Sequence, residues 1–541
     1  MEYIQGCEET TIQNLFKTIG KRTSMIIQAQ IGACGTCINS HIYEGLDDVY
    51  FIAHSLAPER GILKRESIED LPDADIGIID GPICFQGKEE SIQMAEMVRE
   101  KSKILLGLGT CAVGSDTIGG FITKDCSHLL PFFCPYLRTR HPKIENYVSF
   151  DYKLPVCSAN QEGLKRFIRA TLREDTGYLE YFKDPGASTI NVITEAECCM
   201  GCGTCGMACP TGAISYVEQR PRIDAEVCIK CGACFIQCPR SFFSNSVLSL
   251  NRFQNPPDPL LGFYREAYSA RTQDSRIMKI SQDGGIVTTL LCYLLREQIC
   301  DAAVVSVSRH GWDTVPEVVT TPEEVLKAAG TKYTVVPNLM GIKKAADQGY
   351  EKIAFVGVPC QVQGVVKTDV YPFGDRYYHS KIAFVVSIFC MENFLFGNLR
   401  SIIEGKTEVP MDETNKMGIS KGRFWVRSLD GNQFRIPVKF IETYAQKSCS
   451  LCLDFCGELS DISVGSVGTA DGYSTVLVRS EKGKRVFDDF KKTIECEPLS
   501  QEGLKTIQDL ANLKKGKNTR ATRETLTKKR WLMLETLSDL V

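Results

Sequence analysis

Eight of the chain's cysteines fall into two runs of four with the same spacing. In each run, two residues lie between the first and second cysteines and two between the second and third. Three residues lie between the third and fourth cysteines, and a proline follows the fourth. Such close spacing lets several thiolates of one short segment close around a single metal centre. The first run is Cys199, Cys202, Cys205 and Cys209, and the second is Cys228, Cys231, Cys234 and Cys238.

The run C-x2-C-x2-C-x3-C-P is the bacterial ferredoxin pattern, and two copies predict two [4Fe-4S] clusters. The fourth cysteine of each run crosses to the other cluster, so Cys238 is expected to complete the first cluster and Cys209 the second. The alternative is a pair of zinc knuckles. Zinc sites more often include histidine or space their cysteine pairs further apart, which favours clusters.

A second group of thiols follows predicted strands in the first third of the chain. Cys34 and Cys37 lie in IGACGTC, Cys111 in GLGTCAVG and Cys157 in LPVCSAN. Open α/β sheets place ligands at the carboxyl ends of their strands, so these four thiols form a candidate third cluster site. A redox-active or zinc-binding C-x2-C motif, with Cys111 and Cys157 as core residues, is the alternative.

The C-terminal half holds a third group. Cys360 and Cys390 end Val- and Ile-rich runs that are typical of central strands, and the close pair Cys449 and Cys452 follows. The pattern predicts a fourth metal centre, with zinc and [4Fe-4S] both open on spacing alone, and Cys456 is a further nearby thiol. In SQDGGIVTTLL, a glycine pair precedes a predicted apolar helix. The glycines would let a phosphate or the edge of a ring approach the start of the helix, but a glycine pair is also typical of an ordinary turn.

Composition restricts the class of protein. The chain has 541 residues, 25 cysteines and a formal net charge of -3, which gives no electrostatic reason to bind nucleic acid. We find no secretory signal and no apolar run long enough for a membrane helix, so a reducing, cytoplasmic location is expected. Cysteines in such a compartment are more often metal ligands than disulfides.

The elements that would hold these thiols alternate between strands and helices. Apolar runs at Ser24–Ile31, Val49–Ala53, Ile76–Ile79 and Ile104–Leu108 predict buried strands, and the period of Ser91–Glu100 predicts a helix. This alternation favours a parallel, doubly wound sheet. The predicted division is an α/β domain at 1–185, an α+β two-cluster domain at 186–252 and an α/β domain at 260–541. A segment at 513–531 has eight Lys or Arg and one acidic residue, typical of a solvated helix and alternatively a docking site for an acidic partner.

The N-terminal motifs resemble a known family. IGACGTCINS, IIDGPIC, KILLGLGTCAVG and YKLPVC are similar to the small (gamma) subunit of archaeal coenzyme F420-reducing [NiFe] hydrogenases. The resemblance implies a flavodoxin-like domain in which Cys34, Cys37, Cys111 and Cys157 bind a proximal [4Fe-4S] cluster that faces a catalytic subunit. The chain departs from the family after the fourth ligand, where Ser158-Ala159-Asn160 replaces the usual prolines.

Residues 262–500 resemble the beta subunit of coenzyme F420-reducing hydrogenase and its dehydrogenase relatives. The match is carried by ISQDGGIVT, AAGTKYT, GVPCQVQG, FCMENF, GISKGRFWV and DISVGSVGTADGYSTV. The resemblance implies one FAD, a site for coenzyme F420, and a [4Fe-4S] cluster on Cys360, Cys390, Cys449 and Cys452. It implies flavin and deazaflavin contacts from Ser281, Gln282, Gly284, Gly285, Thr331, Lys332, Tyr333 and Gln361, with Lys332 and Tyr333 as catalytic residues.

These features together predict a fused gamma- and beta-like subunit with four [4Fe-4S] clusters and FAD. Its function would be to move electrons between coenzyme F420 and a partner redox enzyme within a hetero-oligomer, because FAD is needed where hydride and single electrons interconvert. The partner would be a [NiFe] hydrogenase large subunit or another enzyme, such as heterodisulfide reductase, carbon monoxide dehydrogenase or formate dehydrogenase. A non-catalytic iron–sulfur carrier or scaffold is the remaining alternative.

Overall fold

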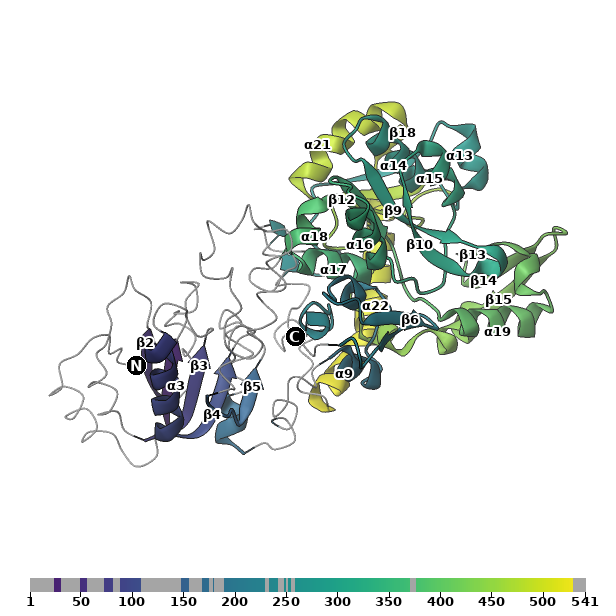
Figure 1. The fold of residues 1–541 in the computed structure, drawn as a ribbon. Helices are drawn as coiled ribbons and strands as arrows, with labels where there is room; N and C mark the ends of the chain where they lie inside the picture. The colour runs from purple at the N-terminus through teal and green to yellow at the C-terminus, as the bar shows by residue number, and fades with distance from the viewer. Residues whose placement is uncertain are drawn as a thin grey trace. The chain divides into compact units, whose positions relative to one another are not determined.

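A computed structural model of the chain divides it into two compact units (Figure 1). It describes residues 24–30, 49–55, 73–80, 88–108, 147–154, 168–174, 179, 189–228, 233–241, 248–249, 252–253, 258–369 and 376–528. The first unit comprises Met1–Thr189 and Ile229–Ile236, and the second comprises Ile190–Cys228 and Gln237–Val541. The short helix α11 (Ala233–Ile236) therefore falls in the first unit.

The first unit contains a five-stranded sheet with order β2-β1-β3-β4-β5, and all of its strand pairs are parallel. Helix α3 packs against it through Met94, Ala95 and Val98 (Figure 1). Buried apolar side chains on consecutive strand residues are typical of parallel sheets, which are covered on both faces. The elements are β1 (Ser24–Gln30), β2 (Val49–Ser55), β3 (Ala74–Asp80), α3 (Lys88–Lys101), β4 (Ser102–Leu108) and β5 (Tyr152–Leu154).

The four predicted strands, the predicted helix and the parallel sheet are thus confirmed. The cysteines expected at this sheet, Cys34, Cys37, Cys111 and Cys157, lie outside the described residues. Strands β1, β4 and β5 precede them in sequence. Because these strands are parallel, their carboxyl ends share one edge of the sheet.

The second unit begins with the first cysteine run. Its elements there are α9 (Ile190–Glu195), α10 (Thr204–Met207) and an antiparallel hairpin of β6 (Ile214–Val217) and β7 (Arg220–Ile223). Cys202 and Met207 share a hydrophobic core with Leu339 and Val362 of the C-terminal half. This shared core joins the first cysteine run to the C-terminal half in one compact unit.

The C-terminal half is built on an eight-stranded mixed sheet, order β10-β9-β11-β12-β16-β17-β8-β18. The runs before Cys360 and Cys390 form β11 and β12, which lie in the middle of the sheet and pair in parallel, as predicted for central strands. The strands are β8 (Glu266–Arg271), β9 (Ala302–Ser308), β10 (Thr314–Val319), β11 (Ile353–Gly357), β12 (Ile382–Ile388), β16 (Ile462–Gly465), β17 (Ser474–Val478) and β18 (Glu495–Pro498).

A separate antiparallel sheet has the order β13-β14-β15, formed by Thr414–Ser420, Arg423–Ser428 and Gln433–Pro437. The helices of this half are α13 (Ser275–Ile280), α14 (Ile286–Arg296), α15 (Pro322–Lys327), α16 (Leu339–Asp347), α17 (Pro359–Lys367), α18 (Arg376–Lys381), α19 (Phe396–Thr407), α20 (Val438–Ile441), α21 (Glu481–Phe490) and α22 (Gln501–Lys528). Short 3-10 turns are η6 (His310–Trp312), η7 (Met411–Glu413), η8 (Glu442–Tyr444), η9 (Lys447–Leu451) and η10 (Lys491–Thr493).

The long helix α22, drawn in yellow in Figure 1, contains the first part of the basic segment 513–531. No helix in the described part of the chain has the length and apolar character needed to cross a membrane. The chain is thus a mixed α/β protein, while the three domain boundaries remain a prediction.

Candidate functional site

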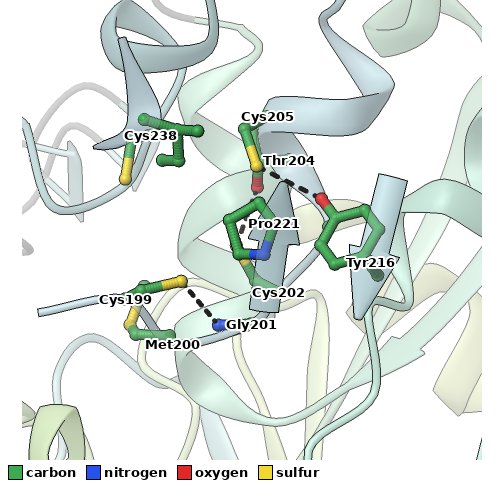
Figure 2. Close-up of a pocket in the computed structure, with 11 residues that line it drawn as sticks. Cys199, Met200, Gly201, Cys202, Thr204, Cys205, Tyr216, Pro221 and Cys238 are labelled. Carbon is green, nitrogen blue, oxygen red and sulfur yellow. Dashed lines mark hydrogen bonds between the residues drawn. The ribbon is translucent and has the colours of Figure 1, made fainter. Parts of the chain in front are cut away.

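Four buried cysteines of the second unit line one pocket, which we call the first site (Figure 2). They are Cys199, Cys202, Cys205 and Cys238. The fourth cysteine of the second run thus lies beside the first three of the first run, which is the arrangement expected for one cluster of a two-cluster ferredoxin.

Each sulfur of the first site takes part in a hydrogen bond. The Gly201 N–H donates to Cys199 Sγ and the Arg240 N–H to Cys238 Sγ, each over 3.4 Å. The Thr204 hydroxyl lies 3.1 Å from Cys202 Sγ. Hydrogen bonds to sulfur are a principal means by which a protein sets the reduction potential of an iron–sulfur cluster.

Tyr216 makes the fourth of these contacts, 3.2 Å from Cys205 Sγ (Figure 2). Its hydroxyl oxygen also accepts a hydrogen bond from the Gly206 N–H, at 3.2 Å. The tyrosine's own proton therefore points to Cys205 when that residue is an acceptor-only thiolate.

Burial makes ionised thiols at the first site unfavourable without a positive partner. It raises the pKa of Cys205 well above the usual value, with the neighbouring Cys202 adding to the shift, and it raises the pKa of Cys238 in the same way. Metal ligation requires thiolates, so an iron core would supply the positive charge that this pocket needs. The donor set therefore fits a cluster.

A lysine lies beside the first site. Lys367, at the end of α17, is fully buried, and its ammonium donates to the carbonyl of Cys238, and to Ser241 O at 2.6 Å and Ser241 Oγ at 2.8 Å. Burial lowers its pKa to about 7, and the thiolates of Cys238 and Cys202 oppose this shift. An anionic centre at the first site would favour the charged form of Lys367, which makes this lysine the candidate counter-charge there.

The loop of the first run is shaped for close packing. Gly203 has φ 99°, in the left-handed region, and a Cβ there would lie 2.6 Å from the Pro337 carbonyl oxygen. The Leu339 N–H at the start of α16 donates to the Cys202 carbonyl at 3.1 Å. A side chain at Gly203 would therefore push the cluster loop away from the C-terminal half.

The second ferredoxin set is only partly described. Cys209 is half-buried and its sulfur lies 3.7 Å from the Thr211 hydroxyl, and Cys228 is also half-buried. Cys231 lies outside the described residues, and Cys234 belongs to the first unit. Their shared cluster remains a prediction.

The four C-terminal cysteines form what we call the C-terminal site. Cys360 is the second residue of α17 after β11, and Cys390 follows the parallel strand β12, so both lie at one edge of the sheet. Cys449 lies in η9 and Cys452 directly follows it. All four are half-buried.

The thiols of the C-terminal site affect one another's pKa. Burial raises the pKa of Cys360 well above its usual value, and the thiolates of Cys452, Cys390, Cys202 and Cys449 raise it further. Helix α17, which carries Cys360, also packs against the first cysteine run, because a Cβ on Gly364 would lie 2.5 Å from Thr204 Oγ1. Burial raises the pKa of Cys390 to about 12, against the opposing charge of Lys514.

Two arginines tie the two sites together. Arg220 donates to the carbonyl of Cys199 at 2.8 Å and to Gln446 Oε1 at 3.2 Å. Arg240 is buried and donates to Leu451 O at 3.0 Å and Ser448 O at 2.9 Å. The arginines thus hold the loop that carries Cys449 against the first site, through hydrogen bonds from charged groups worth about 1.5–3 kcal/mol each.

The glycine pair forms the predicted turn into a helix. Gly285 is the N-cap of α14 with φ 73°, and a Cβ on Gly284 would lie 2.5 Å from the Ala270 carbonyl oxygen. Ser281 is buried, and its carbonyl accepts a hydrogen bond from Lys416 at 2.8 Å. The side chain of Gln282 lies against Gly418 of β13, because a Cβ added to Gly418 would lie 2.5 Å from Gln282 Nε2.

The second predicted contact segment lies next to this turn. Asp283 is among the groups that raise the pKa of Tyr333, after burial itself, so the two side chains are close. The Tyr333 ring packs edge-on against Phe424 with centroids 5.5 Å apart. Thr331 is half-buried beside them along the chain. Gly285, and not Asp283, is the residue that caps α14.

Lys332 is not a solvated loop residue. Its ammonium donates to the carbonyls of Ala328, Ala329 and Gly330, just beyond the end of α15, and burial lowers its pKa to about 8. Three donors directed at carbonyls near a helix C-terminus stabilise the turn. In this arrangement Lys332 holds the turn that precedes Tyr333.

Gln361 connects these segments to the C-terminal site. It is buried, its amide donates to Val336 O at 2.7 Å, and its oxygen accepts the Val358 N–H at 3.0 Å. It therefore fixes the start of α17, next to Cys360. The structure thus brings the glycine turn, the Tyr333 segment and the start of α17 into one region.

The buried polar residues around the two sites are not predicted by the sequence patterns. Lys514 and Asn518 of α22 contact the C-terminal site, whereas the composition of the basic segment is typical of a solvated helix. The prediction of a solvated helix is wrong for Lys514, which is 2% exposed. The spacing of four between these two residues places both on one helix face, but it does not indicate that this face is buried.

Comparisons with known proteins identify the family of the C-terminal half. Residues 267–343 and 350–502 match the two profiles described as coenzyme F420 hydrogenase/dehydrogenase, beta subunit, N-term and C terminus. The chain is 42% identical over 264 residues to the coenzyme F420 hydrogenase subunit beta of Methanothermobacter thermautotrophicus, covering 48% of this chain and 94% of that one. The chain belongs to the family of coenzyme F420 hydrogenase/dehydrogenase beta subunits.

The other regions match separate families. Residues 191–239 match a 4Fe-4S dicluster domain, and residues 32–171 match the NADH ubiquinone oxidoreductase 20 Kd subunit, the hydrogenase small-subunit-like region. A subunit of the F(420)H(2) dehydrogenase of Methanosarcina mazei is 30% identical over 343 residues, covering 60% of this chain and 92% of that one. A solved chain of the F420-reducing [NiFe] hydrogenase complex from Methanosarcina barkeri aligns with TM-score 0.50 and 37% identity, covering 52% of this chain and 100% of that one. This F420 hydrogenase/dehydrogenase-like protein therefore also carries an iron–sulfur domain and a hydrogenase small-subunit-like region.

Proposed function

We propose that this protein transfers electrons between coenzyme F420 and the active site of a partner redox subunit, using FAD and four [4Fe-4S] clusters. When bound, FAD exchanges the hydride of the deazaflavin for single electrons, and the clusters carry those electrons onward. The observation that carries the proposal is the proximity of two four-thiol sites, which are joined by the hydrogen bonds of Arg220 to Cys199 O and Gln446 and of Arg240 to Ser448 O and Leu451 O. Two one-electron sites held side by side serve electron transfer.

The chain's own residues have separate tasks in this proposal. Cys199, Cys202, Cys205 and Cys238 hold one cluster, and Cys360, Cys390, Cys449 and Cys452 hold another. The second ferredoxin set and Cys34, Cys37, Cys111 and Cys157 hold the remaining two.

Residues around the glycine turn hold the flavin and deazaflavin. Gly284 and Gly285 permit close approach of a ring or phosphate at the start of α14. Tyr333 lies beside this turn and is the candidate to contact the reacting ring, while Lys332 positions it. Because Gln361 links this region to the start of α17, electrons would leave toward Cys360.

A partner enzyme completes the proposed reaction. The similar proteins named above are a subunit of an F420 hydrogenase and a subunit of an F420H2 dehydrogenase. A [NiFe] hydrogenase large subunit docked on the small-subunit-like region is the first candidate. A non-hydrogenase redox enzyme is the second, favoured by Ser158-Ala159-Asn160 in place of the prolines usual after the fourth ligand.

The test uses the full chain purified without oxygen. Iron, sulfide and flavin are measured, and reduced F420 is mixed with a one-electron dye. We expect about sixteen iron atoms and one FAD per chain, and dye reduction that depends on F420. Protein with full iron but no flavin and no F420 oxidation would instead identify a carrier or scaffold.

A further inference from the structure

One face of α22 points into the C-terminal site. Lys514, Asn518 and Thr522 follow one another at intervals of four residues, which places them in a row on one side of the helix. Lys514 is 2% exposed, Asn518 4% and Thr522 0%. Buried polar side chains in such a row need partners on the surface against which the helix packs.

Lys514 and Asn518 find these partners at the cysteines of the C-terminal site. The Lys514 ammonium donates to Cys390 O at 2.7 Å and to Asp454 O at 2.8 Å. The Asn518 amide donates to Cys449 O at 3.0 Å and Cys452 O at 2.7 Å. The backbone carbonyls of three of the four cysteines are therefore bound by this one helix.

The neighbouring lysines of α22 are directed elsewhere. Lys515 forms an ion pair with Glu458 at 3.0 Å, and Lys517 forms one with Glu392 at 2.6 Å. The carboxylate of Asp454, whose backbone carbonyl binds Lys514, is also bound elsewhere, because it accepts hydrogen bonds from the N–H groups of Gly457 and Glu458 at 2.7 and 2.9 Å. The Lys514 ammonium, in contrast, binds backbone carbonyls beside the thiols.

The position of the Lys514 ammonium is fixed by these contacts, because it lies 2.7 Å from Cys390 O and 2.8 Å from Asp454 O and the side chain is buried. A lysine nitrogen is thus held beside the backbone of the cysteine ligands in a region of low dielectric, where the field of a positive charge is strong.

We propose that Lys514, held in place with Asn518, is a positioning residue that raises the reduction potential of the [4Fe-4S] centre at the C-terminal site. Reduction there adds one electron and therefore one negative charge, with no bond formed or broken and no proton moved. A neighbouring cation stabilises that added charge, and net charge is one of the properties that set cluster potentials. This inference rests on the cluster assigned to the site in the proposed function.

The experiment compares variants of α22 in the full chain, purified without oxygen. Lys514→Met removes the charge and keeps the apolar stem, Lys514→Arg keeps the charge, and Lys505→Met removes an exposed lysine of the same helix as the matched control. Midpoint potentials are measured by titration followed with electron paramagnetic resonance. The signal of the C-terminal site is identified as the one changed in Cys452→Ser.

We expect Lys514→Met to make reduction of the C-terminal centre at least tenfold less favourable, 59 mV for a one-electron couple. Lys514→Arg and Lys505→Met should keep the wild-type potential, and the first-site potential should not move. Full iron content with an unchanged potential in Lys514→Met would overturn the role of Lys514. Wild-type protein without iron at this site would instead overturn the proposed function.

If Lys514→Met loses the cluster, the iron content and midpoint potential of Lys514→Gln and Lys514→Arg are compared instead. The account predicts that Lys514→Arg retains iron with the wild-type potential. It also predicts that Lys514→Gln either lacks iron at the C-terminal site or has a lower potential there. Loss of iron in both, or a wild-type potential in Lys514→Gln, would show that the charge is not what matters.

Discussion

The first site and the C-terminal site present four thiols each, but the surrounding protein supports them differently. At the first site, three of the four cysteines come from one short run, and each sulfur has its own hydrogen bond. At the C-terminal site, the thiols come from three separate segments, and Lys514 and Asn518 of α22 bind their backbone carbonyls.

The difference shows two ways of stabilising the negative charge of a cluster. Hydrogen bonds to sulfur act locally and depend on the geometry of the loop. A buried cation acts through its field and depends on a helix contributed from elsewhere in the chain. Lys367 adds a buried lysine at the first site as well, so the two sites differ chiefly in the groups that face sulfur. N–H and O–H groups face the sulfurs of the first site, whereas the carbonyls of Glu392, Asn393 and Asp454 face those of Cys390, Cys449 and Cys452.

The largest expected effect follows from removing one thiol at each site. Cys202→Ser should remove the cluster of the first site, and Cys360→Ser that of the C-terminal site, each with loss of about four iron atoms. Cys198→Ser is the control, because Cys198 is buried next to the first run and its thiol donates to Ala196 O at 3.3 Å. If Cys198→Ser lost as much iron as Cys202→Ser, the assignment of the first-site ligands would be contradicted.

Removing the buried cation of the first site is expected to have the next largest effect. Lys367→Met leaves a buried anionic centre without its counter-charge, which costs about 3 kcal/mol in the iron-loaded protein. This loss of stability is measured by thermal unfolding of the iron-loaded protein, followed by the absorbance of the clusters. Lys344→Met is the control, because Lys344 forms an exposed ion pair with Glu317 at 2.6 Å, worth less than about 1 kcal/mol. Equal losses in the two variants would contradict the role of Lys367.

The two clusters should be lost at different rates when the protein is treated with a chelator, because the two sites differ in exposure. The cysteine residues of the first site are buried, whereas those of the C-terminal site are partly exposed as whole residues. We therefore expect an oxidant and chelator to remove the C-terminal cluster several-fold faster, because access governs attack on a bound metal. The two losses are followed by their paramagnetic signals, and faster loss from the first site would reverse the comparison.

The smallest expected effect comes from one hydrogen bond. Tyr216→Phe removes the hydroxyl that faces Cys205, so reduction of the first-site cluster should become less favourable by under tenfold. Tyr268→Phe is the control, because its hydroxyl donates to Glu266 at 3.1 Å instead. An unchanged first-site midpoint in Tyr216→Phe, with full iron, would show that this hydrogen bond does not tune the site.

Much of the architecture could be predicted from the sequence, because its signals are local. The cysteine runs depend on spacings of two and three residues, and strands such as β1 and β4 depend on short apolar runs. The placement of Cys238 beside the first run follows from the same short pattern.

The supporting residues could not be predicted, because their contacts join distant parts of the chain. Lys514 reaches the carbonyl of Cys390 across 124 residues, and Arg240 reaches that of Leu451 across 211. A lysine in a basic helical segment is most often solvated. Only the packing of α22 shows that Lys514 is turned inward.

The most direct test of the account is whether electrons from reduced F420 must pass the C-terminal site to reach the first site. Reduced F420 is mixed rapidly with wild-type protein and with Cys360→Ser under anaerobic conditions, and the first-site signal is followed by freeze-quench paramagnetic resonance. The account predicts reduction of the first site in wild-type protein and its loss in Cys360→Ser, with flavin content unchanged. Reduction at the wild-type rate in Cys360→Ser would contradict it.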